Sequence, residues 1–165
     1  LARGDLDGDG RDEVAYTSHN SMGDRLGPAL HVHDVETGVP RRLTGLTLDS
    51  LLLGQDSERG PSIRIGNIDA DPQLEIVVGH QYISNMAISV IDGLSLQVQW
   101  ERSYGFIYPG IHDLELVGEG VGSKIVVVTR ENVVRLDGQS GAPDWTSPLL
   151  LGVGARRIVL GHLDA

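Results

Sequence analysis

The chain has 165 residues, and 40% of them are hydrophobic, a proportion that is normal for a folded domain and too high for intrinsic disorder. Its formal net charge is −10, so nucleic acids and anionic membranes are poor partners, and no apolar run approaches the roughly 20 residues that span a membrane. The chain has no cysteine, which excludes disulfides, thiol catalysis and cysteine-based zinc sites.

The 22 glycines and several short runs rich in valine and isoleucine predict many short strands separated by turns. No segment shows a convincing helical period; residues 43–55 come nearest, and we interpret them as an insertion or a strand–turn–strand. We expect strands near residues 12–17, 29–34, 75–79, 87–92, 96–101, 124–129, 132–137 and 157–160. The sequence therefore indicates an all-β fold.

Two different patterns recur along the chain. The first is an acidic loop that runs into an apolar strand, as GDLDGDGRDEVAY at 4–16 and GNIDADPQLEIVVG at 66–79. A weaker copy, LVGEGVGSKIVVV, occupies 116–128. The residue just before each apolar run is Glu13, Glu75 or Lys124, so successive copies are 62 and 49 residues apart.

The second pattern is a strand, an aspartate and a turn, at 30–41, 88–100 and 133–145. Its aspartates are Asp34, Asp92 and Asp137, which are 58 and 45 residues apart. Because both patterns recur in the same order with nearly the same period, they indicate an internal repeat.

We place the repeats at approximately 1–62, 63–113 and 114–160, with 161–165 as the start of a further repeat, and we expect the chain to be part of a longer array. Four short strands in about 45–50 residues are the size of one β-propeller blade. A blade buries both faces of its sheet, which explains the unbroken apolar runs better than a half-exposed sheet does.

The stretches DLDGDGRDE followed by VAY, and NIDADPQLE followed by IVVG, resemble FG-GAP/VCBS repeats, the blades of integrin-α-type propellers. The D-x-x-S-x-x-x-x-W stretches that end in Trp100 and Trp145 also resemble PQQ-like propeller repeats. The resemblance covers essentially the whole chain at the level of blades. It implies three four-stranded antiparallel blades of a larger propeller with seven or eight blades.

A D-x-D-x-D-G loop can curl around Ca²⁺, which takes about six to eight oxygen ligands. Positions 1, 3 and 5 supply side-chain oxygens, glycine at position 6 allows a sharp turn, position 7 supplies its carbonyl, and position 9 supplies a carboxylate. The first site is therefore predicted to consist of Asp5, Asp7, Asp9, the Arg11 carbonyl and Glu13. The alternative is an Asp/Gly turn with solvated charges. An EF-hand is excluded because its position 12 is Tyr16, in a predicted strand.

The second loop offers a similar set of ligands, namely Asn67, Asp69, Asp71, the Gln73 carbonyl and Glu75. Its sixth position is Pro72, whose fixed φ prevents the left-handed turn that Gly10 can make, so either the loop turns differently or the ion is lost. In the third loop Gly118, Gly120 and Lys124 replace ligands, and we expect no metal there. We also expect the first loop to bind Ca²⁺ more tightly than the second.

Two further patterns have competing interpretations. Arg3-Gly4-Asp5 spells the integrin-recognition tripeptide, but the repeat already accounts for the glycine and the aspartate. His31 and His33 share one face of a strand and could bind a transition metal, although no third ligand is evident and a half-exposed strand face is the plainer interpretation.

The tryptophans Trp100 and Trp145 could stack on a sugar or a quinone, but their recurrence at one repeat position favours packing between blades. No nucleophile motif appears, and no carboxylate pair lies outside the acidic loops. We therefore expect a calcium-stabilised, secreted or cell-surface scaffold that binds protein or carbohydrate without catalysis. The remaining blades would come from the same chain or from a second copy. The alternative is the propeller portion of a secreted enzyme, a polysaccharide lyase or a PQQ-type dehydrogenase.

Overall fold

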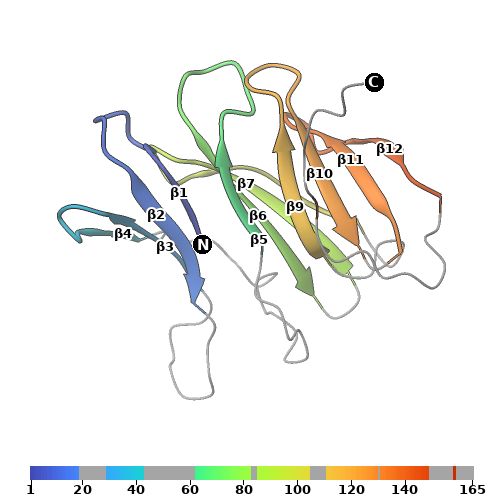
Figure 1. The fold of residues 1–165 in the computed structure, drawn as a ribbon, viewed down its shortest axis with the longest axis horizontal. Helices are drawn as coiled ribbons and strands as arrows, with labels where there is room; N and C mark the ends of the chain where they lie inside the picture. The colour runs from blue at the N-terminus through green and yellow to red at the C-terminus, as the bar shows by residue number, and fades with distance from the viewer. Residues whose placement is uncertain are drawn as a thin grey trace.

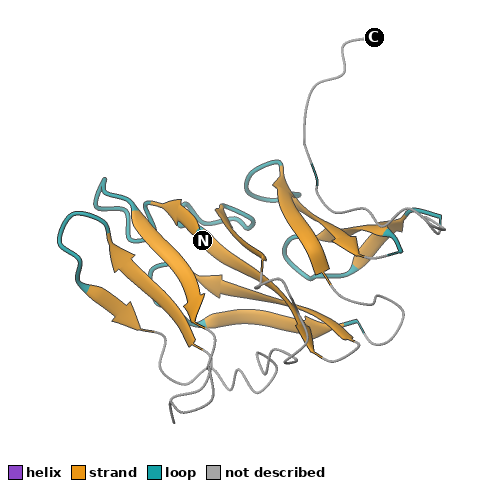
Figure 2. Ribbon diagram, turned by 60° about the horizontal axis from the view of Figure 1, so that its bottom comes forward, coloured by secondary structure: helices purple, strands orange, loops and turns teal. Residues whose placement is uncertain are grey.

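The computed structural model describes residues 1–18, 29–42, 62–82, 85–104, 111–129, 131–148 and 158. These residues form three four-stranded antiparallel sheets and no helix (Figures 1 and 2). No helix long and apolar enough to span a membrane occurs in this part of the chain. The expectation of an all-β fold is confirmed.

Each sheet is a meander in which strands adjacent in the sequence pair with one another. The first sheet contains β1 (Ala2–Gly4), β2 (Glu13–Ser18), β3 (Ala29–Asp34) and β4 (Pro40–Arg42). The second contains β5 (Ser62–Gly66), β6 (Glu75–Tyr82), β7 (Asn85–Asp92) and β8 (Val98–Ser103). The third contains β9 (Ile111–Val117), β10 (Lys124–Thr129), β11 (Val133–Asp137) and β12 (Pro143–Thr146).

The sequence predicted the strands with apolar runs, and β2, β3, β6, β7, β8, β10 and β11 all lie close to their expected ranges. It did not locate β1, β5 and β9, which open the sheets, or the closing strands β4 and β12. The ranges 43–55 and 157–160 lie outside the described residues except for Ile158, which is not in a strand.

The three sheets lie side by side, and their opening strands are neighbours in space (Figure 1). Strand β5 contacts β1 on one side and β9 on the other. Ion pairs join β5 to β9, because Nη2 of Arg64 on β5 lies 3.0 Å from Oδ1 of Asp113 and 2.7 Å from Oε1 of Glu115, both on β9. The sheets are thus joined along their first strands.

Two separate apolar cores fill the spaces between the sheets. The first lies between the first and second sheets and consists of Leu6, Ala15, Leu30, Val32, Ile63, Ile76, Val78 and Ile91. The second lies between the second and third sheets and consists of Ile68, Val77, Ile88, Val90, Leu114, Ile125, Val127, Val134 and Leu136. Within β6, Ile76 and Val78 enter one core and Val77 the other, because successive side chains of a strand point to opposite faces. The run of consecutive apolar residues thus reflects burial of both faces of the middle sheet.

The two acidic loops each insert one aliphatic side chain between sheets. Leu6 and Ile68 are each only 1% exposed. Leu6 packs against the second sheet, where a Cβ atom on Gly93 would lie 2.6 Å from its Cδ2. Ile68 joins the second core, and its carbonyl accepts a hydrogen bond at 3.0 Å from Oγ of Ser123, in the loop before β10 of the third sheet. Each loop is therefore anchored in the joint between its own sheet and the next.

The aspartates of the second sequence pattern cap the turns between the last two strands of each sheet. Asp34, Asp92 and Asp137 accept hydrogen bonds from the backbone N–H groups of Thr37, Ser95 and Ser140, respectively. The residue four places after each aspartate has a left-handed φ: Gly38 at 68°, Leu96 at 55° and Gly141 at 65°. This pattern is thus a repeated turn.

Trp100 packs between sheets, as its recurrence predicted. Its Nε1 donates to the carbonyl of Gly138 at 3.1 Å, and the hydroxyl of Tyr104 donates to the carbonyl of Gly141 at 2.7 Å. Both acceptors belong to the last turn of the third sheet. Trp145 has the corresponding place on the third sheet and is 49% exposed.

Replacing a loop anchor should destabilise the whole fold. We expect Leu6→Ala and Ile68→Ala each to lower the free energy of unfolding by about 2–5 kcal/mol, since each leaves a cavity at a joint between sheets. Val121→Ala is the matched control, because Val121 is 69% exposed and its loss should change stability by less than about 0.5 kcal/mol. Urea denaturation measures all three. Equal effects of Leu6→Ala and Val121→Ala would contradict the anchoring role.

Candidate metal centre

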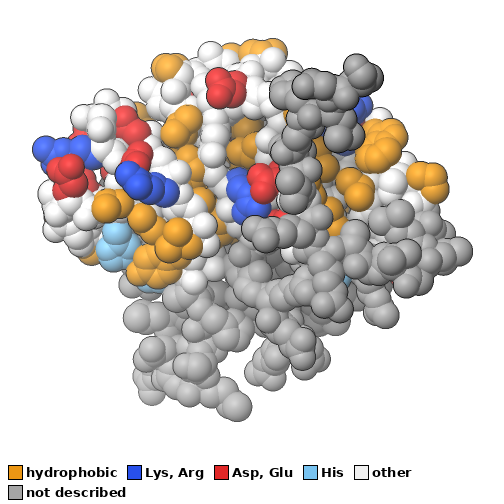
Figure 3. All heavy atoms as spheres, in the orientation of Figure 1, with side chains coloured by type: hydrophobic (Ala, Val, Ile, Leu, Met, Phe, Trp, Pro, Cys, Tyr) orange, Lys and Arg blue, Asp and Glu red, His pale blue; other side chains and the backbone are white. Residues whose placement is uncertain are grey.

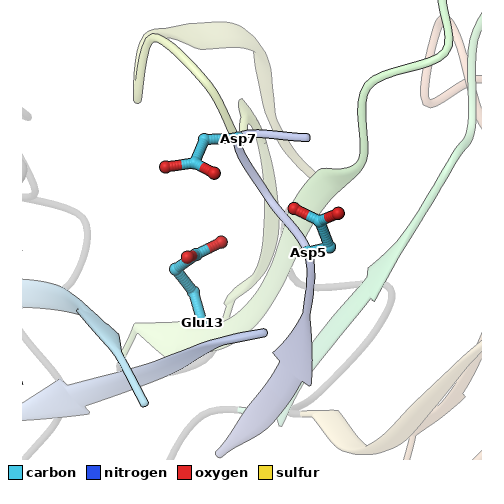
Figure 4. A group of neighbouring side chains, drawn as sticks. All are labelled: Asp5, Asp7 and Glu13. Carbon is cyan, nitrogen blue, oxygen red and sulfur yellow. The ribbon is translucent and has the colours of Figure 1, made fainter. Parts of the chain in front are cut away.

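Each acidic loop gathers three carboxylates around one small space. One oxygen from each of Asp5, Asp7 and Glu13 lies within 4.8 Å of the others, and Asp69, Asp71 and Glu75 form a second group by the same measure. In Figure 4 the aspartates project from the loop that follows β1, and Glu13 reaches them from the start of β2.

Strand pairing determines the length of each loop. Gly4 pairs with Glu13 and Gly66 pairs with Glu75, so eight residues lie between β1 and β2 and between β5 and β6. In the third sheet Val117 pairs with Lys124, which leaves six residues. The third loop is therefore two residues shorter, so it cannot follow the spacing of the other two loops along its whole length.

The lysine of the third sheet neutralises acidic residues of its own sheet. Nζ of Lys124 lies 3.0 Å from Oδ2 of Asp137 and 3.3 Å from Oδ2 of Asp144. The hydrogen bond from Lys124 is the main reason that the pKa of Asp137 is lowered. An internal cation thus occupies the strand start where the other two sheets place a glutamate.

The glutamate at the start of the second strand of each sheet holds its loop through a backbone hydrogen bond. Glu13 is 1% exposed and Glu75 is fully buried. Oε2 of Glu13 accepts from the N–H of Leu6, and Oε2 of Glu75 accepts from the N–H of Ile68, both at 2.7 Å. The same glutamate therefore fixes the loop backbone and contributes to the carboxylate group.

Two further acceptors in the second loop are buried without a hydrogen bond from any described residue. They are Oε1 of Glu75 and Oδ1 of Asn67. Buried acceptors normally find a donor, because leaving one unsatisfied costs free energy. Together with Asp69 and Asp71, these two oxygens form the kind of ligand set that is expected around a cation.

Burial raises the pKa of Glu75 to about 7. The negative charges of Asp69, Asp71 and Asp92 raise it further, and the N–H of Ile68 opposes them. Without a cation, ionisation of this carboxyl group therefore opposes folding.

The remaining ligands predicted in the first loop are arranged differently. Asp5 accepts from the N–H groups of Gly8 and Gly10, at 2.8 and 3.0 Å, and Gly10 has the expected left-handed φ of 88°. Asp9 is not in the close carboxylate group; its Oδ1 accepts from the N–H of Arg11 at 2.9 Å. In the first loop, the carboxylates that lie close together are therefore those at positions 1, 3 and 9, namely Asp5, Asp7 and Glu13.

In the second loop, the carboxylates that lie close together are those at positions 3, 5 and 9, namely Asp69, Asp71 and Glu75. Position 1 is Asn67. Its turn includes a hydrogen bond from the N–H of Gln73 to Oδ1 of Asp71 at 2.9 Å. Pro72 is not among the residues with a left-handed φ, as its ring requires, so this loop does turn differently from the first. The carboxylates still converge.

Two contacts that no sequence pattern indicated support the second loop from outside. Nε2 of Gln99 on β8 donates to Oδ2 of Asp69 at 3.0 Å. The N–H of Gly120, in the loop of the third sheet, donates to the carbonyl of Asn67 at 3.0 Å. The second acidic loop is therefore braced by its own edge strand and by the neighbouring sheet.

Comparisons of this sequence with protein-family models and with curated proteins find no match. The chemistry of the site consequently rests on its own residues. Carboxylate, amide and carbonyl oxygens are hard donors, which suit Ca²⁺ and Mg²⁺ better than softer transition metals.

Removing the charge of Glu75 should have opposite effects with and without a bound cation. In EDTA, the folded-state pKa of Glu75, about 7, exceeds the ordinary 4.5, so the contribution of Glu75 to stability is fully present below pH 4.5 and is lost as the pH rises through 7. Glu75→Gln keeps an acceptor for Ile68 but cannot ionise. At alkaline pH in EDTA we expect it to be more stable than the wild type by on the order of 3 kcal/mol.

With saturating Ca²⁺ the order should reverse, because the variant has lost a charged ligand. Chemical denaturation across pH with and without EDTA measures both effects. Glu131→Gln, at an exposed position, is the control. A variant less stable than wild type in EDTA at alkaline pH would show that burial of the Glu75 charge costs nothing.

Proposed function

We propose that this chain is an arc of a calcium-stabilised β-propeller of the FG-GAP/VCBS kind, acting as a secreted or cell-surface scaffold for protein or carbohydrate without catalysis. The observation that carries the proposal is the recurrence, in two neighbouring sheets, of a buried glutamate facing loop carboxylates at the joint between sheets. The side-by-side opening strands β1, β5 and β9 support the propeller arrangement, in which such strands line a central axis.

The proposed ligands are those of the two acidic loops. Asp5, Asp7, Asp9, Glu13 and the Arg11 carbonyl would hold one ion, and Asn67, Asp69, Asp71, Glu75 and the Gln73 carbonyl would hold the other. Bound Ca²⁺ supplies positive charge that offsets the mutual repulsion of the carboxylates. Since the same loops insert Leu6 and Ile68 between sheets, fixing the loops stabilises both joints.

The position of the acidic loops supports a scaffold role. The loop carboxylates close a structural turn, and the glutamates are buried, so an ion here would serve the fold and leave the other loops to bind a ligand. Further blades would come from the same chain or from a second copy, and the partner would be a protein or a carbohydrate.

Calcium should raise the melting temperature. An ion that binds only the folded state stabilises it by about 2.7 kcal/mol at 100 times its dissociation constant. We expect EDTA to lower the melting temperature, added Ca²⁺ to restore it, and Mg²⁺ to restore it less, because Mg²⁺ demands a stricter octahedral geometry. Differential scanning calorimetry measures the shifts. Identical melting curves in EDTA and in Ca²⁺ would contradict the proposal.

The two sites should be separable by mutation. We expect isothermal titration to find two Ca²⁺ ions per wild-type chain, one for Asp7→Asn, one for Glu75→Gln, and none for the double variant. Glu119→Gln in the shorter third loop is the matched control and should keep both ions. Loss of an ion from the Glu119→Gln variant would contradict the assignment of the third loop as a non-binding turn.

A further inference from the structure

The face of the first sheet that points away from the second sheet carries an unusual group of side chains. In the second and third sheets, the corresponding positions are buried against the preceding sheet. They are Ile76, Val78, Ser89 and Ile91 in the second sheet and Ile125, Val127, Val134 and Leu136 in the third. In the first sheet the strand register places Val14, Tyr16, His31 and His33 there. Polar rings thus replace mainly aliphatic side chains.

A neighbouring turn also departs from the pattern. The residue after the capping aspartate is Gly93 in the second sheet and Gly138 in the third. A Cβ atom there would lie 2.6 Å from the Cδ2 atom of Leu6 and from Oγ of Ser123, respectively, so glycine is needed for close packing. The first sheet has Val35, which is 52% exposed. This turn is therefore not built for the contact that the second sheet makes with the inserted Leu6.

The three rings on this face form one cluster. The Tyr16 ring stacks on His31 with centroids 5.0 Å apart and on His33 with centroids 5.4 Å apart. The two imidazole centroids are 6.4 Å apart. The Tyr16 hydroxyl lies 3.0 Å from Nε2 of His33, so the polar ends of these two rings meet. Figure 3 shows histidine surface, in pale blue, over the first sheet.

We propose that Tyr16, His31 and His33 form a binding site for a borderline divalent transition-metal ion of the Zn²⁺ class. Imidazole nitrogen is the preferred donor for such ions. The strand places both histidines on one face two residues apart, and the adjacent strand adds the tyrosine hydroxyl as a third ligand or as a partner that orients His33. Tyr16 is the third polar group that the sequence alone did not reveal.

The distances suit an ion after a small adjustment. Two imidazoles that share a tetrahedral ion, at about 2.0–2.1 Å from each nitrogen, have centroids roughly 5 Å apart. The two rings would therefore close by roughly 1 Å. The rings stack on one another, so their faces are engaged. A sugar would need a ring face, and the stacking therefore favours a metal ion over a sugar.

The site differs in chemistry from the acidic loops, so the two can be tested apart. Zn²⁺ is titrated into the full chain in a large excess of Ca²⁺, which occupies or competes at the oxygen ligands, and binding is followed by calorimetry. We expect one Zn²⁺ per chain. His31→Gln and His33→Gln should each weaken binding at least about 100-fold, because losing a ligand costs more than the 10–100-fold typical of an outer-shell partner. Tyr16→Phe should weaken it about 10–100-fold.

His112→Gln on β9 is the matched control and should leave Zn²⁺ affinity unchanged. Co²⁺ provides a second readout, since its visible absorption reports nitrogen ligation and should disappear in the histidine variants even if their stability changes. Far-ultraviolet circular dichroism confirms that each variant is folded. Unchanged Zn²⁺ affinity in both folded histidine variants, or an equal loss in His112→Gln, would overturn the proposal. Loss of binding in Asp7→Asn alone would assign the ion to the acidic loop instead.

Discussion

One hydrogen bond governs the construction of the acidic loops: the backbone N–H of the second loop residue donates to a buried glutamate at the start of the following strand. It occurs from Leu6 to Glu13 and from Ile68 to Glu75, with the same length of 2.7 Å. Because the donor belongs to the residue whose side chain enters the core, one contact fixes both the loop backbone and the apolar anchor. The neighbouring aspartates are then brought to the same place by the turn. Core packing and charge clustering are consequences of the same local geometry.

This arrangement has a cost that the third sheet avoids. A buried glutamate beside two aspartates concentrates negative charge in a poorly solvated place, which the raised pKa of Glu75 reflects. The third sheet has a lysine at that strand start and a loop two residues shorter, and its charges are balanced by ion pairs within the sheet. A cation bound at the acidic loops, as proposed, would give the first two sheets the same balance. Within one molecule, therefore, the third sheet balances its carboxylates with a lysine of its own, whereas the loops of the first two sheets have carboxylate groups suited to an ion.

The sequence predicted the strands whose apolar side chains are consecutive, and it missed those whose composition is mixed. Strand β6 was evident because burial on both faces removes the polar residues that would interrupt it. Strand β5 contains Arg64, which looks solvent-exposed in the sequence and is instead paired with two carboxylates of β9. For the acidic loops, spacing alone identified the carboxylates that converge, whereas Asp9, also predicted as a ligand, lies outside the close group. Contacts such as Gln99 to Asp69 join residues 30 positions apart and depend on how strand β8 returns beside the loop.

The two cores do not merge, and this determines how stability is shared along the chain. Only the middle sheet contributes to both, through alternate residues of β6 and β7. In such an arrangement each sheet contacts only the neighbouring sheets. The free energy of unfolding is then approximately the sum of the stabilities of the individual sheets and of the interfaces between neighbouring sheets. The first loop acts on the first joint through Leu6, and the second loop acts on the second joint through Ile68. An ion in either loop would therefore strengthen one joint directly and affect the other only through the middle sheet. The outward face of the first sheet, where polar rings replace the aliphatic residues of a joint, belongs to neither of these two cores.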